Sequence, residues 1–271
     1  RQIIPISARE GDNVAQRSSS MDWYDGPTVI ETLAGFTPPQ PATGQPLRMP
    51  LQDVYKFDDR RILAGRVESG SLAVGDELIF SPSNRTTRIA TIEGWNTDGD
   101  IRHAEAGQSI GITLEEQIFV ERGEIASHFE NAPVETDVFH LRLFWLVDTP
   151  LEIGTRYGLK LGPRQLDATI ERIERVIDVD ALSDHAAGQV TRDDIAAVVV
   201  RSSQLVALDP HDDLPHTGRA ILFDRHRTLA GGVISMGSYP DQREQVTVRA
   251  SNLTEVDHDV DNARRAARNR H

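Results

Sequence analysis

The sequence predicts a mainly β protein built from two consecutive antiparallel β-barrels, with a short α/β segment at its N-terminus and a partial helix at its C-terminus. Short runs rich in β-branched residues recur from Leu47 to about residue 238, at a spacing of roughly 10 residues. Gly, Asp and Ser residues separate these runs, which is the pattern of small closed barrels or sandwiches. Helical periodicity is confined to the two ends of the chain.

Composition limits the class of protein. The chain has 271 residues, with 38% hydrophobic and 26% charged residues, and this length suits roughly two domains. No run approaches the roughly 18–20 apolar residues of a membrane span, and no signal peptide is visible. The absence of cysteine excludes disulfides, thiolate metal sites and cysteine nucleophiles, and fits a cytoplasmic protein. A net charge of −13 disfavours nucleic acid as a partner.

Residues 1–36 form the first segment. Ile3, Ile4 and Ile6 resemble the end of a buried strand, and the polar residues 7–12 form the loop that leaves it. Open α/β sheets place ligand contacts in such loops. Because only six residues precede this loop, we expect the rest of its sheet to lie in a domain upstream.

A short helix follows in the stretch YDGPTVIETLAGF. Asp25 or Gly26 would cap it, Pro27 would occupy its first position, and Gly35 would follow its end. Its apolar face has no partner within the segment and comprises Val29, Ile30 and Leu33. We therefore expect this helix to pack against the same upstream domain.

Residues 37–46 contain four prolines and one glycine, so they are predicted to be an extended linker. The first barrel is predicted over residues 47–130, with turns at Gly75-Asp76 and Asp98-Gly99. Asp58–Arg61 is predicted to be a charged hairpin turn, with contact to the upstream domain as the alternative. Residues 128–137 are predicted to connect the two barrels.

The second barrel is predicted over residues 131–240 and the tail over residues 241–271. Within it, LDATIERIERVIDV could be taken for a helix, but Leu166, Ala168 and Ile170 alternate as in a strand. Gly231-Gly232 predicts a bulge or a tight corner, or close approach of another backbone. The tail passes from acidic residues to arginines, which is typical of a surface helix.

Several stretches resemble translation-factor GTPases. GRVESGSLAVGDELIFSP is similar to their second-domain barrel, and TGRAILFDRHRTLAGGVI to the closing strands of the third domain of elongation factor Tu. PISAREGDN falls where this family keeps its last guanine-contacting loop. The two barrels are thus expected to resemble domains II and III of elongation factor Tu, and residues 1–36 the end of a GTPase domain.

One branch is closer, the large GTPase subunit of sulfate adenylyltransferase. The stretches ISAREGDNVAQRSSSMDWYDGPTVIETL and LRMPLQDVYKFDDRRILAGRVESGSLAVGDELIFSPSN resemble that subunit closely. The tail from Ala250 resembles the leader of adenylylsulfate kinase, and the family includes fusions of the two activities.

The resemblance implies a function for the intact protein. GTP hydrolysis would be coupled to the reaction of ATP with sulfate, which gives adenylylsulfate and pyrophosphate on a separate small catalytic subunit. GTP and Mg²⁺ would be the cofactors, and the partners would be that subunit and the chain's own GTPase domain. Ser7 and Ala8 would contact guanine, and a backbone N–H of this loop would help select guanine over adenine.

Other parts of a GTPase site are missing from the sequence. A phosphate loop needs Gly-Lys-[Ser/Thr], and the base needs an Asn-Lys-x-Asp segment. The only lysines, Lys56 and Lys160, follow Tyr55 and Leu159, so neither fits these motifs. We expect this chain alone to be inactive and to bind no cofactor, with Ser7 and Ala8 acting only in the intact protein.

Three other groups suggest sites more weakly. The loop from His211 to His216 could mimic metal ligands, but a solvated loop is the simpler interpretation. His140 lies in an apolar strand and is interpreted as a satisfied core or edge residue. The arginines of residues 263–270 are interpreted as a solvated helix face rather than a nucleic-acid contact.

Two further functions stay open on the sequence. A translation factor could carry aminoacyl-tRNA with the same barrels, although MDWYDGPT and the acidic charge argue against it. The chain could also be a non-enzymatic β-barrel interaction module.

Overall fold

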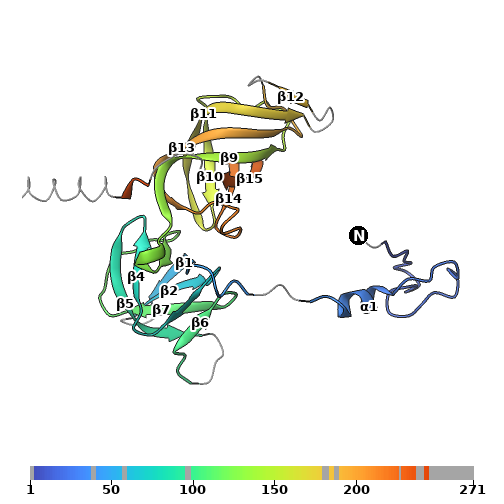
Figure 1. Cartoon of the computed structure of the whole chain (residues 1–271), viewed down its shortest axis with the longest axis horizontal. Helices are drawn as coiled ribbons and strands as arrows, with labels where there is room; N and C mark the ends of the chain where they lie inside the picture. The colour runs from blue at the N-terminus through green and yellow to red at the C-terminus, as the bar shows by residue number, and fades with distance from the viewer. Residues whose placement is uncertain are drawn as a thin grey trace, which may run out of the picture. The chain divides into compact units, whose positions relative to one another are not determined.

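The computed structural model describes residues 3–37, 41–56, 60–94, 99–178, 183–185, 189–225, 227–235 and 241–243. The chain divides into two units, Arg1–Pro41 and Ala42–His271. The second unit contains both barrels, each seen as a ring of strands in Figure 1. None of the described helices is long and apolar enough to span a membrane.

The first unit contains the helix α1 (Val29–Ala34). Thr28 is its N-cap: its hydroxyl accepts from the N–H of Glu31 at 3.2 Å, and the Glu31 carboxylate accepts from the N–H of Thr28 at 2.8 Å. The prediction of Asp25 or Gly26 as the cap was wrong. The helix begins later, and the reciprocal bonds of Thr28 and Glu31 satisfy its first free N–H groups. Gly35 follows the helix as predicted.

The predicted buried strand at Ile3–Ile6 is absent. Ile3 is 87% exposed and Ile6 is 49% exposed, and the described residues of this unit contain no strand. An isolated extended segment has no ladder to satisfy its backbone groups, so a hydrophobic run alone does not make a strand. Ile30 and Leu33 on α1 are also exposed, consistent with the absence of a partner within the segment.

The first barrel is a closed ring in the order β1-β2-β7-β5-β4-β8. A separate pair, β3 (Ser71–Ala73) and β6 (His103–Glu105), lies beside it. The ring strands are β1 (Met49–Lys56), β2 (Arg61–Arg66), β4 (Glu77–Ser81), β5 (Arg85–Glu93), β7 (Ser109–Leu114) and β8 (Ile125–Ser127). They surround a core that includes Met49, Leu63, Phe80, Ile89 and Ile112.

Two predicted turns of this barrel can be compared with the structure. Gly75 has φ +92°, a conformation that favours glycine. Lys56 pairs with Arg61 across the β1–β2 hairpin, as the predicted hairpin requires. Asp58 and Asp98 lie outside the described residues.

The second barrel follows the order β10-β14-β15-β9-β13-β11, and β10 also pairs with β11, which closes the ring. Its strands are β9 (Val134–Trp145), β10 (Arg156–Leu161), β11 (Arg164–Asp178), β13 (Ile195–Leu208), β14 (Arg219–Asp224) and β15 (Arg227–Ser235), while β12 (Ser183–His185) extends β11. In the core, the rings of Trp145 and Tyr157 meet edge to face at 6.1 Å. The strand prediction for LDATIERIERVIDV is confirmed by β11.

The connection between the barrels is shorter than predicted. It holds the 3₁₀ turn η1 (Phe129–Asn131), and β9 already begins at Val134 rather than after residue 137. The predicted tail helix and its arginines lie outside the described residues.

Gly231 and Gly232 lie within the regular part of β15, so the predicted bulge is not at these residues. Gly232 pairs with Ala220 on one side and Leu143 on the other. A Cβ atom on Gly232 would lie 2.6 Å from the carbonyl oxygen of Arg142, whereas one on Gly231 would meet nothing within 4 Å. Close backbone approach, the alternative interpretation, therefore accounts for Gly232.

This contrast generates a prediction for two adjacent glycines. Gly232→Ala should lower the free energy of unfolding by about 1–3 kcal/mol, because the strand must shift away from β9. Gly231→Ala should change it by less than about 0.5 kcal/mol, since the added methyl group meets open space. Urea unfolding followed by fluorescence measures both, and equal effects would contradict the close approach at Gly232.

Candidate guanine-contact loop and the junction between the barrels

The loop with Ser7 and Ala8 is a compact turn. The N–H of Gly11 donates to the carbonyl of Ser7 at 2.8 Å, and the N–H of Glu10 donates to the Ser7 hydroxyl at 3.3 Å. Gly11 has φ +79°, which lets the chain reverse. Ser7 is half-buried and Ala8 is exposed. The Ala8 backbone is thus accessible, while the Ser7 hydroxyl already has a partner within the loop.

Asn13 is the buried residue that fixes this loop. It has φ +54°, its amide donates to the carbonyl of Pro5 at 3.0 Å, and its Oδ1 accepts from the N–H of Ser18 at 2.9 Å. Its carbonyl accepts from the N–H of Val29 at 3.0 Å, so the loop also satisfies the start of α1. Sequence reasoning missed Asn13, although asparagine tolerates positive φ and follows Gly11-Asp12, which was the available signal.

The described residues do not fit the rest of a GTP site. Lys56 ends β1 and Lys160 lies on β10, so both lysines belong to barrel strands and not to a loop between a strand and a helix. Among the residues that the structure describes, no group of three or more His, Asp or Glu is arranged to hold a metal ion.

A buried ion pair joins the two barrels. The guanidinium of Arg48, just before β1, donates from Nη2 to Asp209 Oδ1 at 2.8 Å and from Nε to Oδ2 at 2.9 Å. Both side chains are only 5% exposed. Asp209 directly follows β13, so this bidentate contact connects the first strand of one barrel to the strand end of the other.

The remaining hydrogen-bonding groups of this pair are also satisfied. Arg48 Nη1 donates to the carbonyls of Leu47 at 2.8 Å and Asn131 at 2.7 Å, and the Thr217 hydroxyl donates to Asp209 Oδ2 at 2.7 Å. A buried ion pair requires such additional bonds, because taking two charges out of water is costly.

The loop at His211–His216 belongs to this junction. It was predicted to be solvated, and Asp212, Asp213, Pro215 and His216 are indeed exposed. Leu214 is buried, and His216 Nδ1 lies 3.7 Å from Glu68 of the first barrel. The next residue is Thr217, which binds Asp209. The polar sequence gave no sign of this contact, because Leu214 is the one residue of the loop that is buried.

One further hydrogen bond and one interaction between charges cross between the barrels. Asn84 Nδ2 donates to Glu135 Oε2 at 2.8 Å, and Glu135 is fully buried. On the first barrel, Glu124 accepts from the Ser83 hydroxyl at 2.6 Å, and burial raises the pKa of Glu124. Burial lowers the pKa of Arg164 on the second barrel, while the charges of Glu124 and Glu121 oppose that change.

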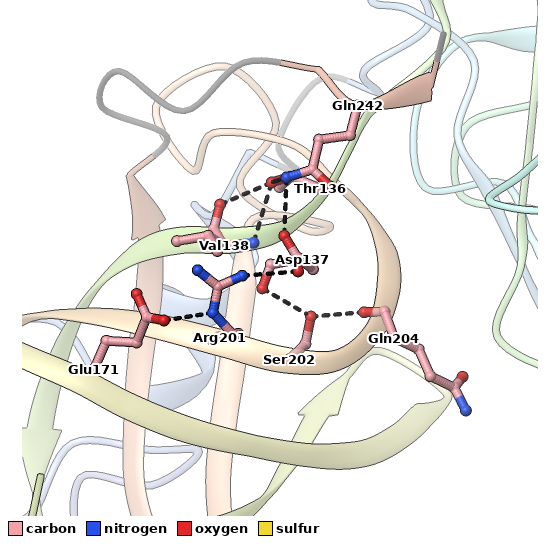
Figure 2. A network of polar contacts seen from close by, with 8 residues as sticks. All are labelled: Thr136, Asp137, Val138, Glu171, Arg201, Ser202, Gln204 and Gln242. Atoms are coloured by element: carbon pink, nitrogen blue, oxygen red, sulfur yellow. Dashed lines mark hydrogen bonds and ion pairs between the residues drawn. The ribbon is translucent and has the colours of Figure 1, made fainter. Parts of the chain in front are cut away.

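Figure 2 shows the polar network beside a large bulge of the second barrel. The β13–β9 register shifts between Arg201 and Val206, and the Ser202 hydroxyl donates to the carbonyls of Asp137 at 3.1 Å and Gln204 at 2.7 Å. Arg201 donates to Glu171 and, at 2.8 Å, to Asp137, and the bond to Glu171 raises the pKa of Arg201. The network thus fixes the bend of the strand that ends beside Asp209.

His140 lies next to this network. Its Nδ1 lies 2.9 Å from Glu174 Oε2, and the side chain is half-buried on β9. The interpretation as a satisfied strand residue is confirmed. The hydrogen bond from Arg172 lowers the pKa of Glu174, and the charge of His140 acts in the same direction.

Comparisons with known proteins agree with this architecture. Residues 138–235 match the family described as GTP-eEF1A C-terminal domain-like. Sulfate adenylyltransferase subunit 1 of Vibrio vulnificus (strain YJ016) is 32% identical over 255 residues, which are 93% of this chain and 52% of that relative. This chain is a homologue of sulfate adenylyltransferase subunit 1. It spans about half the length of such relatives.

A second relative and a solved structure are also similar to this homologue of subunit 1. The bifunctional enzyme NodQ of Azospirillum brasilense is 35% identical over 237 residues, covering 85% of this chain and 38% of that enzyme. The crystal structure of Sup35 complexed with GDP superposes with a TM-score of 0.67 at 22% identity, over 85% of this chain and 57% of that one. The latter likeness establishes the fold: the two barrels are arranged as in that structure.

The buried pair at the junction of this subunit 1 homologue generates a prediction. Arg48→Met should lower the free energy of unfolding by about 3–5 kcal/mol, because Asp209 is left charged and buried without its partner. Replacing both residues, with Arg48→Met and Asp209→Leu, should restore at least half of that loss. Calorimetry measures the change and shows whether the barrels then unfold in two transitions.

A surface ion pair provides the control. Arg192 and Asp148 lie 3.2 Å apart with side chains that are 58% and 80% exposed. Arg192→Gln should change the free energy of unfolding by less than about 1 kcal/mol. An equal effect of Arg48→Met and Arg192→Gln would contradict the role given to the buried pair.

Proposed function

We propose that this chain is the two-barrel portion of the GTP-hydrolysing subunit of a cytoplasmic sulfate adenylyltransferase. In the intact protein, GTP hydrolysis would be coupled to the reaction of ATP with sulfate to give adenylylsulfate and pyrophosphate. The observation that carries the proposal is the 32% identity to sulfate adenylyltransferase subunit 1 over 93% of the chain. By this proposal the 271 residues alone hydrolyse no nucleotide.

The barrels act in this proposal as one rigid body. The buried Arg48–Asp209 pair and the partly buried Asn84–Glu135 contact both cross the junction. A body held in this way can move as a whole when a GTPase domain changes its nucleotide state. Its outer surface would bind the small catalytic subunit, on which adenylyl transfer takes place.

Ser7 and Ala8 form the guanine-contact loop in this proposal. The exposed Ala8 backbone would offer its N–H to the guanine oxygen, and the buried Asn13 would hold the loop in shape. The phosphates and Mg²⁺ would be bound by a GTPase domain encoded upstream of Arg1. Fusion to an adenylylsulfate kinase, with residues 241–271 as the leader, is supported by the bifunctional relative NodQ.

The guanine-contact role predicts a loss of base selectivity. In the protein whose reading frame upstream of Arg1 encodes the phosphate loop, Ala8→Pro should weaken GTP binding at least tenfold, because it removes the backbone N–H. Ala8→Gly keeps that N–H and should bind GTP within about threefold of the unsubstituted protein. Competition between GTP and ATP for a fluorescent guanine nucleotide measures the effect.

Two results would contradict this proposal. A stop codon and a native start directly before Arg1 would exclude an upstream GTPase domain in the same chain. Equal GTP affinity of Ala8→Pro and Ala8→Gly would remove the loop from guanine recognition.

The partner proposed for the barrels can be tested directly. The immobilised chain should retain the small catalytic subunit of sulfate adenylyltransferase in a pull-down and should not retain aminoacyl-tRNA. Elongation factor Tu in its GTP form serves as the positive control for the tRNA arm. Retention of tRNA without the small subunit would favour the translation-factor alternative instead.

A further inference from the structure

A cleft of about 440 Å³ lies between the two barrels, at a distance in sequence from the guanine-contact loop. Pro50, Arg66 and Arg122 of the first barrel line one part of it, and Lys160, Arg164 and Thr217 of the second barrel line another. The cleft thus exists only when both barrels are held in their observed arrangement.

The wall of this cleft is fixed by the junction already described. Thr217 lines the cleft and donates to Asp209, which holds Arg48. Gly123 also lines it, with φ +90°, and a Cβ atom there would lie 2.8 Å from the Cα of Arg164. The two backbones therefore meet closely at this side of the cleft, so its shape is built into the fold.

Positive charge gathers around the cleft, although the whole chain has a net charge of −13. Four cationic residues line it, Arg66, Arg122, Lys160 and Arg164, against one carboxylate, Glu68. Glu68 already lies 3.8 Å from Arg66 and 3.7 Å from His216. The lining therefore carries an excess of positive charge.

Arg122 and Lys160 are the two cationic residues of the lining whose charges are available to a ligand. Both are exposed, and neither side chain has a hydrogen bond or ion pair to any residue within the described ranges. Arg164 is half-buried and faces the charges of Glu124 and Glu121, so its own charge is partly compensated. An anion entering the cleft would meet Arg122 from one barrel and Lys160 from the other.

The rest of the lining is largely apolar. Proline and aliphatic residues form this wall: Pro50, Ile125, Leu161, Pro163 and Val206. Small-molecule sites have this character, with a mainly apolar surface and a few polar groups that fix the orientation of the ligand. The volume also lies within the usual range of about 300–1,000 Å³ for such sites.

We propose that this cleft binds an organic phosphate. Its phosphate would lie between Arg122 and Lys160, and a flat apolar moiety would pack on the proline and aliphatic wall. A single small anion suits a cleft of this volume, whereas the acidic surface of the chain opposes a long polyanion. The inference depends on the two barrels alone and holds whether or not the proposed function is correct.

AMP is a suitable probe because it joins a dianionic phosphate to a flat ring system. Isothermal titration of the 271-residue chain should give saturable binding of one AMP. The affinity should fall at least threefold when NaCl is raised from 50 to 200 mM, because added salt screens the attraction between the phosphate and the two cations. Adenosine, without the phosphate, should bind at least tenfold more weakly. The double variant Arg122→Gln/Lys160→Gln should lose at least tenfold in AMP affinity and keep its melting temperature, since both side chains are exposed.

Arg156→Gln is the matched control. Arg156 lies on β10 like Lys160, is exposed, pairs with Asp167 at 3.4 Å and does not line the cleft. It should change AMP affinity less than twofold. Three results would each overturn the proposal: no binding at about 10 mM AMP, a concentration at which even weak sites are occupied; equal affinity for AMP and adenosine; or the same loss of AMP affinity in Arg156→Gln as in the double variant. Displacement of AMP from the cleft by micromolar poly-glutamate would overturn it in favour of an acidic peptide ligand.

Discussion

The arrangement of the two barrels depends on one buried contact, the bidentate pair of Arg48 and Asp209. Charges buried to this extent are stable only with a partner and with their remaining hydrogen bonds satisfied. The carbonyls of Leu47 and Asn131 and the hydroxyl of Thr217 complete that requirement. Sliding or rotation of one barrel against the other would break several of these bonds together, which favours a single arrangement.

The bulge of β13 contributes to this geometry. Its unpaired backbone groups are bonded by Ser202, and Arg201 and Asp137 fix its edge (Figure 2). The strand that leaves the bulge ends at Leu208 and presents Asp209 to the first barrel. The surface polar network and the buried ion pair are therefore connected through the same strand, β13. The cleft beside Thr217 takes its shape from the same contacts.

Sequence periodicity was sufficient for the barrels but not for the junction. The alternation around Leu166 and Ile170 identified β11, because period 2 is a property of neighbouring residues. The Arg48–Asp209 pair joins residues 161 positions apart, and no local pattern marks either residue as buried. At the N-terminus, the hydrophobic run Ile3–Ile6 misled the strand prediction for a related reason: a strand requires a neighbour. Ser7 and Ala8 were placed in a loop correctly. Asn13 was missed, because its position after Gly11-Asp12 suggests a turn but does not show that its amide is buried and bonded to both sides of the loop.

Glu135 has a consequence for whatever the chain carries beyond the second barrel. This buried carboxylate accepts from Asn84 of the first barrel at 2.8 Å and lies 3.3 Å from Nε of Arg243, which follows β15 along the chain. Gln242 adds a main-chain bond to the carbonyl of Glu135 at 2.7 Å. The point from which the following residues depart is thus fastened where the barrels meet, rather than at the free end of a barrel. Any segment that continues from Arg243 therefore begins beside the junction of the two barrels.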